Sequence, residues 1–148
     1  MEIRATQESD RTYIARLNFL TDTFGDERGE LSSGFADDFS FYVENWEPNQ
    51  GGFIAWEDLV PAGGVWLSWG TEDNHGYGFV EPSIPEFAIA VESRFAGQGI
   101  ATALIDAGFN VQPQPTALIY AQDKLKMREK LAAFGAPVPR FAAIDSVA

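Results

Sequence analysis

The spacing of apolar residues along the chain changes several times between a helical period and a strand period. Apolar side chains recur every three or four positions in three segments, which is typical of helices with one buried face. These predicted helices run from a cap at Thr6 or Ser9 to about Phe19, over residues 35–46 and over residues 99–108. Short apolar runs bounded by glycine or proline predict strands over residues 2–5, 52–57, 65–69 and 86–92.

Polar and glycine-rich segments separate these elements and predict loops. The loops cover residues 22–33, 48–52, 58–64 and 70–85. Aromatic residues of the second helix repeat at helical spacing, and we interpret them as core packing rather than as a ligand site: Phe35, Phe39, Tyr42 and Trp46. The predicted order is therefore a strand, two helices, a pair of strands, one further strand and a helix.

The composition limits the class of protein. A chain of 148 residues with 45% hydrophobic residues, twelve Phe and four Trp can bury one core, so we expect a single domain over residues 1–148. The sequence has no apolar run long enough to predict a membrane span, and its first ten residues lack the pattern of a signal peptide. The absence of cysteine excludes disulfides, thiolate metal sites and a Cys nucleophile. We expect a cytoplasmic protein.

The charge is distributed unevenly. The net charge is −12, and residues 1–110 carry nineteen acidic residues against five arginines and no lysine. An acidic body argues against nucleic acid as a partner, because such binding needs a basic face. It favours a cationic partner such as an amine, although an acidic surface that only maintains solubility explains the charge equally well.

One segment carries the strongest functional pattern. An apolar strand that begins near Ala88 runs into a tight loop with Gly97 and Gly99, and an apolar helix follows at once up to Ile105. Backbone N–H groups at the start of a helix bind anions, and glycine lets a phosphate approach closely. An ordinary glycine turn without a ligand is the alternative.

This segment resembles motif A of the GNAT superfamily of acetyl-CoA-dependent N-acetyltransferases. Val91 opens the motif, and it is completed by Gly97, Gln98, Gly99, Ile100 and Ala101, while Ala96 stands where the family usually carries Arg or Gln. The resemblance covers residues 1–109. It implies an α+β fold with a mixed, mostly antiparallel sheet flanked by helices, and acetyl-CoA as the acyl donor.

The resemblance also implies which residues hold acetyl-CoA. The last strand would bind the pantetheine arm through Ile89, Ala90 and Val91, with the Val91 N–H directed at the thioester oxygen. Main-chain amides of the glycine loop would bind the pyrophosphate, which assigns Ala96, Gly97, Gln98, Gly99, Ile100 and Ala101. The replacement of Arg or Gln by Ala96 would weaken this site without abolishing it.

Candidate catalytic residues are fewer. Glu86, at the start of the same strand, is our candidate base, directly or through water, with a solvated strand-end carboxylate as the alternative. His75 and Glu81 are further loop residues with no supporting pattern, and one histidine without spaced partners predicts no metal site. Many GNAT enzymes use a Tyr as general acid where this chain has Leu131, so Tyr120 is the substitute candidate.

The chain changes character after Phe109. Residues 110–144, with Gln122-Asp-Lys124 and Gly135-Ala-Pro-Val-Pro139 as the specific part, resemble an internal piece of the ATP-grasp subunit of phosphoribosylaminoimidazole carboxylase. About 35 residues cannot form an ATP site, so we expect a chimera whose atypical segment, residues 110–148, completes the sheet. The expected elements there are a strand over 116–121, a helix over 124–134 and a strand over 138–144.

These observations leave more than one class of function open. The first hypothesis is an N-acetyltransferase that moves an acetyl group directly from acetyl-CoA to a primary amine of a small molecule or peptide. The second is a folded but catalytically inert GNAT-like domain that binds CoA weakly or not at all. The third is an interaction module, because a poorly packed terminal segment exposes strand edges that favour a homodimer.

Overall fold

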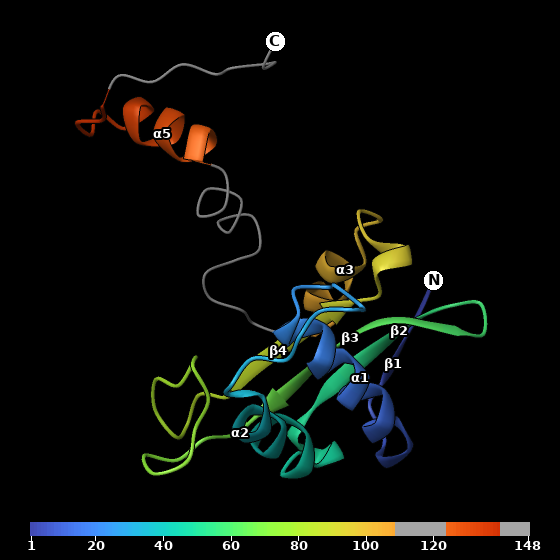
Figure 1. Ribbon diagram of the computed structural model, residues 1–148. Helices are drawn as coiled ribbons and strands as arrows, with labels where there is room; N and C mark the ends of the chain where they lie inside the picture. Colours follow the sequence, from blue (N-terminus) through green and yellow to red (C-terminus); the bar gives the residue numbers. More distant parts are fainter. Residues whose placement is uncertain (109–123, 140–148) are drawn as a thin grey trace. The chain divides into compact units, whose positions relative to one another are not determined.

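A computed structural model describes residues 1–108 and 124–139 of the chain. They belong to two compact units, residues 1–108 and 109–148. In the first unit the strands are β1 (Glu2–Ala5), β2 (Gly52–Glu57), β3 (Val60–Ser68) and β4 (Glu86–Val91). Its helices are α1 (Arg11–Asp22), α2 (Phe35–Phe39) and α3 (Ile100–Asp106) (Figure 1). No helix within the described ranges is both long and apolar enough to cross a membrane.

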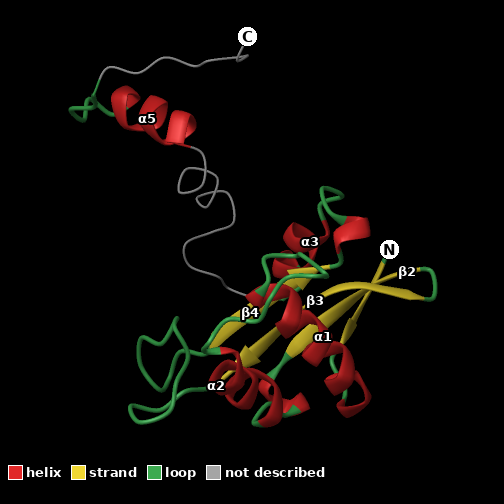
Figure 2. Ribbon diagram, viewed as in Figure 1, coloured by secondary structure: helices red, strands yellow, loops and turns green. Residues whose placement is uncertain are grey.

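The four strands form one antiparallel sheet in the order β1-β2-β3-β4 (Figure 2). Ile3 lies opposite Ala55, and Val65 lies opposite both Phe53 and Ile89, so β3 is central and β4 is an edge among the described residues. The sheet and its flanking helices confirm the predicted α+β class. The edge position of β4 decides where backbone groups remain available.

The β2–β3 connection differs from the prediction. β3 begins at Val60 rather than at residue 65, so a short hairpin turn replaces the predicted loop over 58–64. Pro61 and Gly64 suggested a loop, but the pairing with β2 shifts between Ala55 and Trp56, which accommodates the proline. Gly64 is present for a packing reason, because a Cβ there would lie 2.6 Å from the Ile54 side chain.

The two faces of the sheet are covered by different helices. On one face, α1 and the segment after α2 pack through Leu17, Val43 and Trp46 against Ile54 and Trp66. The buried residues of α3, which contacts β2, β3 and β4, are Ile100, Leu104 and Ile105. Side chains alternate along a strand, so Phe53 faces away from Ile54, and a Cβ on Gly108 would lie 3.2 Å from the Phe53 ring. Therefore α3 covers the opposite face.

The helices also begin and end differently from the prediction. α1 starts at Arg11, because residues 8–10 form a separate 3₁₀ turn in which the Asp10 carboxylate accepts the Gln7 N–H at 2.8 Å. The predicted helix over 35–46 divides into α2 and a wider π-type turn over Ser40–Glu44. This turn presents the Tyr42 carbonyl to the indole N–H of Trp66 at 2.9 Å.

In the second unit the structure describes α5 (Lys124–Ala133) and the residues that follow it up to 139. The predicted helix over 124–134 is confirmed to within one residue. Gly135 closes the helix with a φ of 75°, and its N–H donates to the Ala132 carbonyl at 2.9 Å. The predicted strand over 116–121 and most of the one over 138–144 lie outside the described residues.

Candidate functional site

The outer edge of β4 is the starting point of the site. Directly after β4, the Glu92 N–H donates to the Ala62 carbonyl at 2.9 Å. In an antiparallel ladder, residues that bond to the partner strand alternate with residues whose N–H and C=O groups point away from it. By this alternation Ala90 bonds toward β3, whereas Ile89 and Val91 direct their backbone groups outward. No described strand pairs with that side of β4.

Two cavities follow this edge and meet near its middle. Cavity one, of about 510 Å³, contains Phe87, Ala88 and Ile89 of β4. Cavity two, of about 540 Å³, contains Ile89, Ala90 and Val91 and continues to Ser93 and Ala96. Residues common to both cavities are Thr21, Phe24 and Ile89. The shared residues place one continuous surface along β4, with its two halves joined at Ile89.

The glycine corner follows cavity two along the chain. Gly97 and Gly99 have φ angles of 75° and 78°, the left-handed conformation that favours glycine. A Cβ built on either residue would meet nothing within 4 Å, so both backbones face open space. The Ala103 N–H bonds to the Gly99 carbonyl at 3.0 Å, so helical geometry gives the N–H groups of Ile100 and Ala101 no acceptor within α3. The corner thus offers accessible backbone donors.

Cavity one has an acidic lining. Asp22 and Asp38 both contribute to it, together with Ser32 and the aromatic rings of Tyr42 and Tyr77. Burial raises the pKa of the Asp38 carboxyl, and the charges of nearby carboxylates raise it further. This half of the site therefore favours a positively charged occupant over an anionic one.

Asn18 adds a buried amide to cavity one. Its side chain is 4% exposed, and its Nδ2 has no hydrogen-bond partner in the described part of the chain. A buried donor without a partner is unfavourable, and such groups usually find an acceptor when a ligand or water occupies the site. The amide is therefore available to bind an oxygen atom in cavity one.

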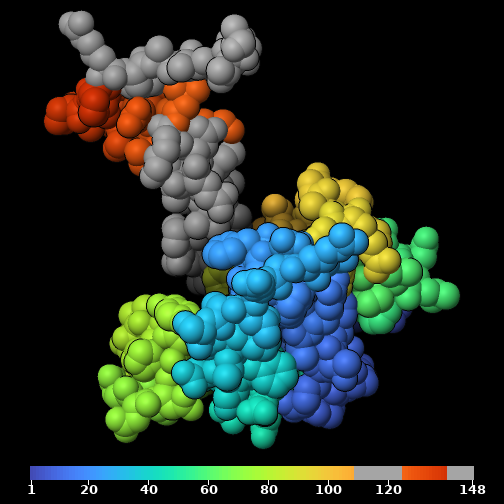
Figure 3. Space-filling model, viewed as in Figure 1, coloured from blue at the N-terminus to red at the C-terminus, as the bar shows by residue number. Residues whose placement is uncertain are grey.

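Glu86 lies beside cavity one without lining it. Its side chain is buried and accepts hydrogen bonds from the Gly76 N–H at 2.8 Å, the Gly78 N–H at 2.7 Å and the Tyr42 hydroxyl at 3.1 Å. These bonds hold residues 76–78 of the 70–85 segment, which Figure 3 shows in yellow-green beside the cyan α2 region. Tyr42 is the only one of these partners that lines the cavity. Glu86 thus contacts the cavity through the Tyr42 hydroxyl.

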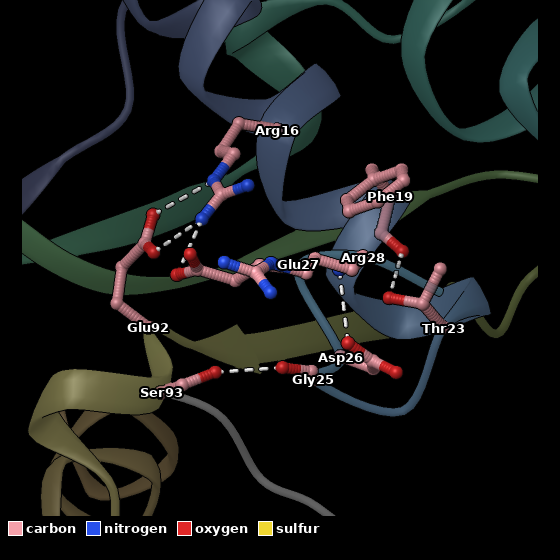
Figure 4. Close-up of polar contacts among 9 residues, drawn as sticks. All are labelled: Arg16, Phe19, Thr23, Gly25, Asp26, Glu27, Arg28, Glu92 and Ser93. Atoms are coloured by element: carbon pink, nitrogen blue, oxygen red, sulfur yellow. Dashed lines mark hydrogen bonds and ion pairs between the residues drawn. The ribbon is translucent and has the colours of Figure 1, made fainter. Parts of the chain in front are cut away.

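A second network joins α1 to the end of β4 (Figure 4). The Arg16 guanidinium donates to Glu92 at 2.9 Å and 3.3 Å, and to the exposed Glu27 at 2.9 Å. The Ser93 hydroxyl donates to the Gly25 carbonyl at 2.7 Å. The Glu92 side chain is buried, with only 5% of the residue exposed. Its ion pair with Arg16 and the hydrogen bond from Ser93 to Gly25 together hold α1 and the residues after it beside the wall of cavity two.

The predicted site residues fall into distinct groups. Ile89, Ala90, Val91 and Ala96, which the sequence predicted to bind the cofactor, all line cavity two, and the residues directly after Ala96 form the glycine corner. Tyr120 lies outside the described residues. His75 is exposed and stacks on Phe79 at 4.5 Å. Leu131, at the position of the usual general acid, is 41% exposed.

Sequence reasoning missed most of cavity one. Asn18, Asp22 and Asp38 carried no motif, and Tyr42 was interpreted as a core residue because of its helical spacing. No local signal distinguishes these residues, since they come together only where α1 packs on β4 and also contacts α2 and the turn over Ser40–Glu44.

Comparison with known proteins decides the family. The acetyltransferase (GNAT) family matches residues 17–112, which include the second half of α1, the sheet strands β2 to β4 and the glycine corner. The chain belongs to the GNAT acetyltransferase family. The predicted resemblance over residues 1–109 to this family is thereby confirmed.

Among solved structures, two GNAT proteins are similar to this chain. A GCN5-related N-acetyltransferase from Ralstonia eutropha JMP134 is 16% identical, with a TM-score of 0.47 over 99% of this chain and 97% of that one. Diaminobutyrate acetyltransferase EctA from Paenibacillus lautus, solved with its substrate and coenzyme A, is 17% identical, with a TM-score of 0.45 over 88% of this chain and 76% of that one.

A different relationship concerns a short stretch of the chain. Over 45 residues, 30% of this chain, it is 78% identical to N5-carboxyaminoimidazole ribonucleotide synthase from Corynebacterium ammoniagenes. The enzyme from Mycobacterium leprae is 61% identical over 44 residues. The chain spans about a tenth of the length of these curated relatives, 11% and 10% respectively. This confirms the predicted resemblance to an internal fragment of an ATP-grasp protein.

Proposed function

We propose that this GNAT protein transfers an acetyl group directly from acetyl-CoA to a primary amine. One observation carries the proposal: two cavities meet at Ile89 along a strand edge whose backbone N–H groups point outward. Direct transfer needs the thioester and the amine side by side, and proximity of this kind lowers the barrier of a bimolecular reaction. Cavity two takes the acyl donor, and cavity one takes the amine.

The residues present fit acetyl-CoA. Outward backbone groups of Ile89 and Val91 are free to bond the pantetheine arm, with Ala90 in the wall of cavity two and the Val91 N–H available to the thioester oxygen. The pyrophosphate belongs at the glycine corner, with the main-chain donors of Gly97, Gln98, Gly99, Ile100 and Ala101. The Ala96 N–H already donates to the Ser93 carbonyl at 3.2 Å, so Ala96 contributes to the wall of cavity two beside them. Open space above both glycines leaves room for its close approach.

Proton transfer completes the reaction. The amine nitrogen forms the new C–N bond, the C–S bond breaks, and the ammonium proton must leave while the thiolate of CoA gains one. We assign the acceptor role to Glu86 acting through the Tyr42 hydroxyl, which donates to Glu86 and lines cavity one. Tyr120 remains our candidate for the acid that protonates the thiolate.

A folded but inert GNAT-like domain is the second candidate. Ala96, in place of the Arg or Gln that the family carries, removes one side-chain donor from the pyrophosphate site. Leu131, in place of Tyr, removes the usual general acid. Such a protein would bind acetyl-CoA without releasing CoA when amines are supplied.

Binding of acetyl-CoA by the full chain tests the proposal. A ligand at 100 times its Kd stabilises the folded state by about 2.7 kcal/mol, so the melting temperature should rise clearly at millimolar acetyl-CoA. Gly99→Ala places a methyl group in the open space and should abolish this rise. Gly51→Ala is the control, because Gly51 also has a positive φ, 98°, but lies directly before β2 and lines neither cavity.

Both variants introduce a side chain at a positive φ, so both should lose folding stability, by about 1–2 kcal/mol at Gly99 and about 1–3 kcal/mol at Gly51, whose ψ is 157°. Only Gly99→Ala should lose the response to acetyl-CoA. An unchanged melting temperature of the wild-type protein at millimolar acetyl-CoA would contradict the proposal. Release of CoA thiol in the presence of an amine then separates the active protein from the inert one.

A further inference from the structure

Cavity one is lined by two carboxylates and a buried amide, and binding a simple amine would need only the carboxylates. The additional amide therefore bears on the identity of the acceptor. Resting on the proposed acetyl transfer, we propose that the acceptor is a cationic amine with a neutral oxygen on the adjacent carbon chain, either an amino alcohol or an aminoacyl amide. A zwitterionic amino acid is excluded from this class. The argument depends on the charges, the buried amide and the apolar walls of cavity one.

The first step concerns charge. Among the described residues that line cavity one, the charged side chains are Asp22 and Asp38, and no Lys, Arg or His accompanies them. The Asp22 carboxylate accepts both the N–H of Ser32, at 2.8 Å, and its hydroxyl. The charge of Asp22 is one of the nearby charges that raise the pKa of Asp38, so the two carboxylates repel each other. An ammonium group in the cavity would relieve the repulsion between the two carboxylates.

The second step concerns Asn18. Its amide is 4% exposed, faces cavity one and has an unpartnered Nδ2 among the described residues. A donor of this kind requires an oxygen acceptor, which an alkylamine does not have. A hydroxyl or carbonyl oxygen near the amine supplies it without adding negative charge.

The third step excludes a free carboxylate. A zwitterionic amino acid would also offer oxygen to Asn18, but its carboxylate would enter a cavity that already holds two carboxylates. Like charges that approach within a few ångströms in a partly buried site repel strongly. The remaining walls include the aromatic rings of Phe24, Tyr42, Tyr77 and Phe87, which suit the short carbon chain of an amino alcohol or amide.

Four small amines of similar size test the inference: glycinamide, ethanolamine, glycine and propylamine. Each is titrated calorimetrically into the full-length protein saturated with CoA, so that binding is measured without turnover. Glycinamide or ethanolamine should bind about tenfold more tightly than propylamine, the value of one additional hydrogen bond. Glycine should bind most weakly. Whether one or both oxygen compounds bind distinguishes the carbonyl from the hydroxyl as the recognised group.

Asn18→Leu keeps the branching of the side chain at Cγ, with two larger methyl groups, and removes the donor. It should abolish the preference for glycinamide and ethanolamine over propylamine, with an unchanged or higher melting temperature, because an unsatisfied buried polar group is replaced by an apolar one. Asn45→Leu makes the same chemical change at an exposed residue that does not line the cavity and should leave the order of affinities intact.

Asp38→Asn should reduce the discrimination against glycine. Binding of glycine as tight as that of glycinamide, or a preference for glycinamide that survives Asn18→Leu, would overturn the inference. Failure of the proposed function has a different signature, since it would leave these affinities in place while acetyl-CoA released no CoA with any of the four amines.

Discussion

Phe24 combines backbone strain with a position at the site, and it allows a prediction in which stability and activity change in opposite directions. Its φ is 54°, in the left-handed region that aromatic residues avoid, and its side chain is 98% exposed. It lines both cavities where they meet. Strained residues that persist at functional sites often serve the ligand rather than the fold. We expect Phe24→Gly to stabilise the protein and to impair acetyl transfer.

The magnitude follows from two opposing terms. Left-handed backbone costs a non-glycine residue about 1–2 kcal/mol, and glycine relieves this cost. Glycine also gives the unfolded chain more conformational freedom, which lowers the stability of the folded state by about 0.5–1 kcal/mol. Loss of the exposed ring forfeits almost no buried surface. The net gain is about 0.5–1 kcal/mol, which corresponds to a rise in melting temperature of about 2–6 °C for a unit of this size.

Two assays on the same variant check this prediction. Urea denaturation of the full chain should show the increase in stability, and thiol release from acetyl-CoA should show a decrease in kcat/KM of about tenfold, since an aromatic wall is lost. Asp58→Gly is the control, because Asp58 has a φ of 53° in the β2–β3 turn and lines neither cavity. It should gain less stability, since Asp tolerates this conformation better, and should retain full activity. A less stable Phe24→Gly would refute the strain argument, and unchanged activity would remove Phe24 from the site.

Two further predictions concern charged groups. Arg16→Met leaves the buried Glu92 without its counter-ion and should lower the free energy of unfolding by about 2 kcal/mol, less than for a fully buried pair because the Arg16 side chain is 36% exposed. The control Glu27→Gln removes the charge of an exposed partner and should lower it by under about 0.5 kcal/mol in the same urea titration. Burial and neighbouring carboxylates raise the pKa of Asp38, so the folded protein binds the Asp38 proton more tightly than the unfolded chain does. Stability is therefore lost as the pH rises through the folded pKa and Asp38 ionises. Asp38→Asn should therefore stabilise the protein at pH 7 but not at pH 3; equal gains at both pH values would contradict this assignment.

Local pattern predicted a large part of the fold. The positions of β2 and β4 were recoverable from the strand pattern to within about a residue, because burial imposes that pattern on the sequence itself. β1 and α5 were also located to within about a residue, although none of their described side chains is buried. The β3 start was not recoverable. Its glycines look like loop residues, and only the close approach of the Ile54 side chain shows why Gly64 belongs in a strand.

The sequence by itself determined the family and the residues that we propose for the cofactor half of the site. Motif A is contiguous, so the residues from Val91 through the glycine corner are adjacent in space because they are adjacent in the chain. Tertiary structure alone decided the acceptor half. Tyr42 and Glu86 are 44 positions apart, and Asn18 and Asp38 reach the same cavity only when helices pack over β4. Such contacts leave no periodic trace, because they depend on how elements pack and not on the local conformation of any one of them.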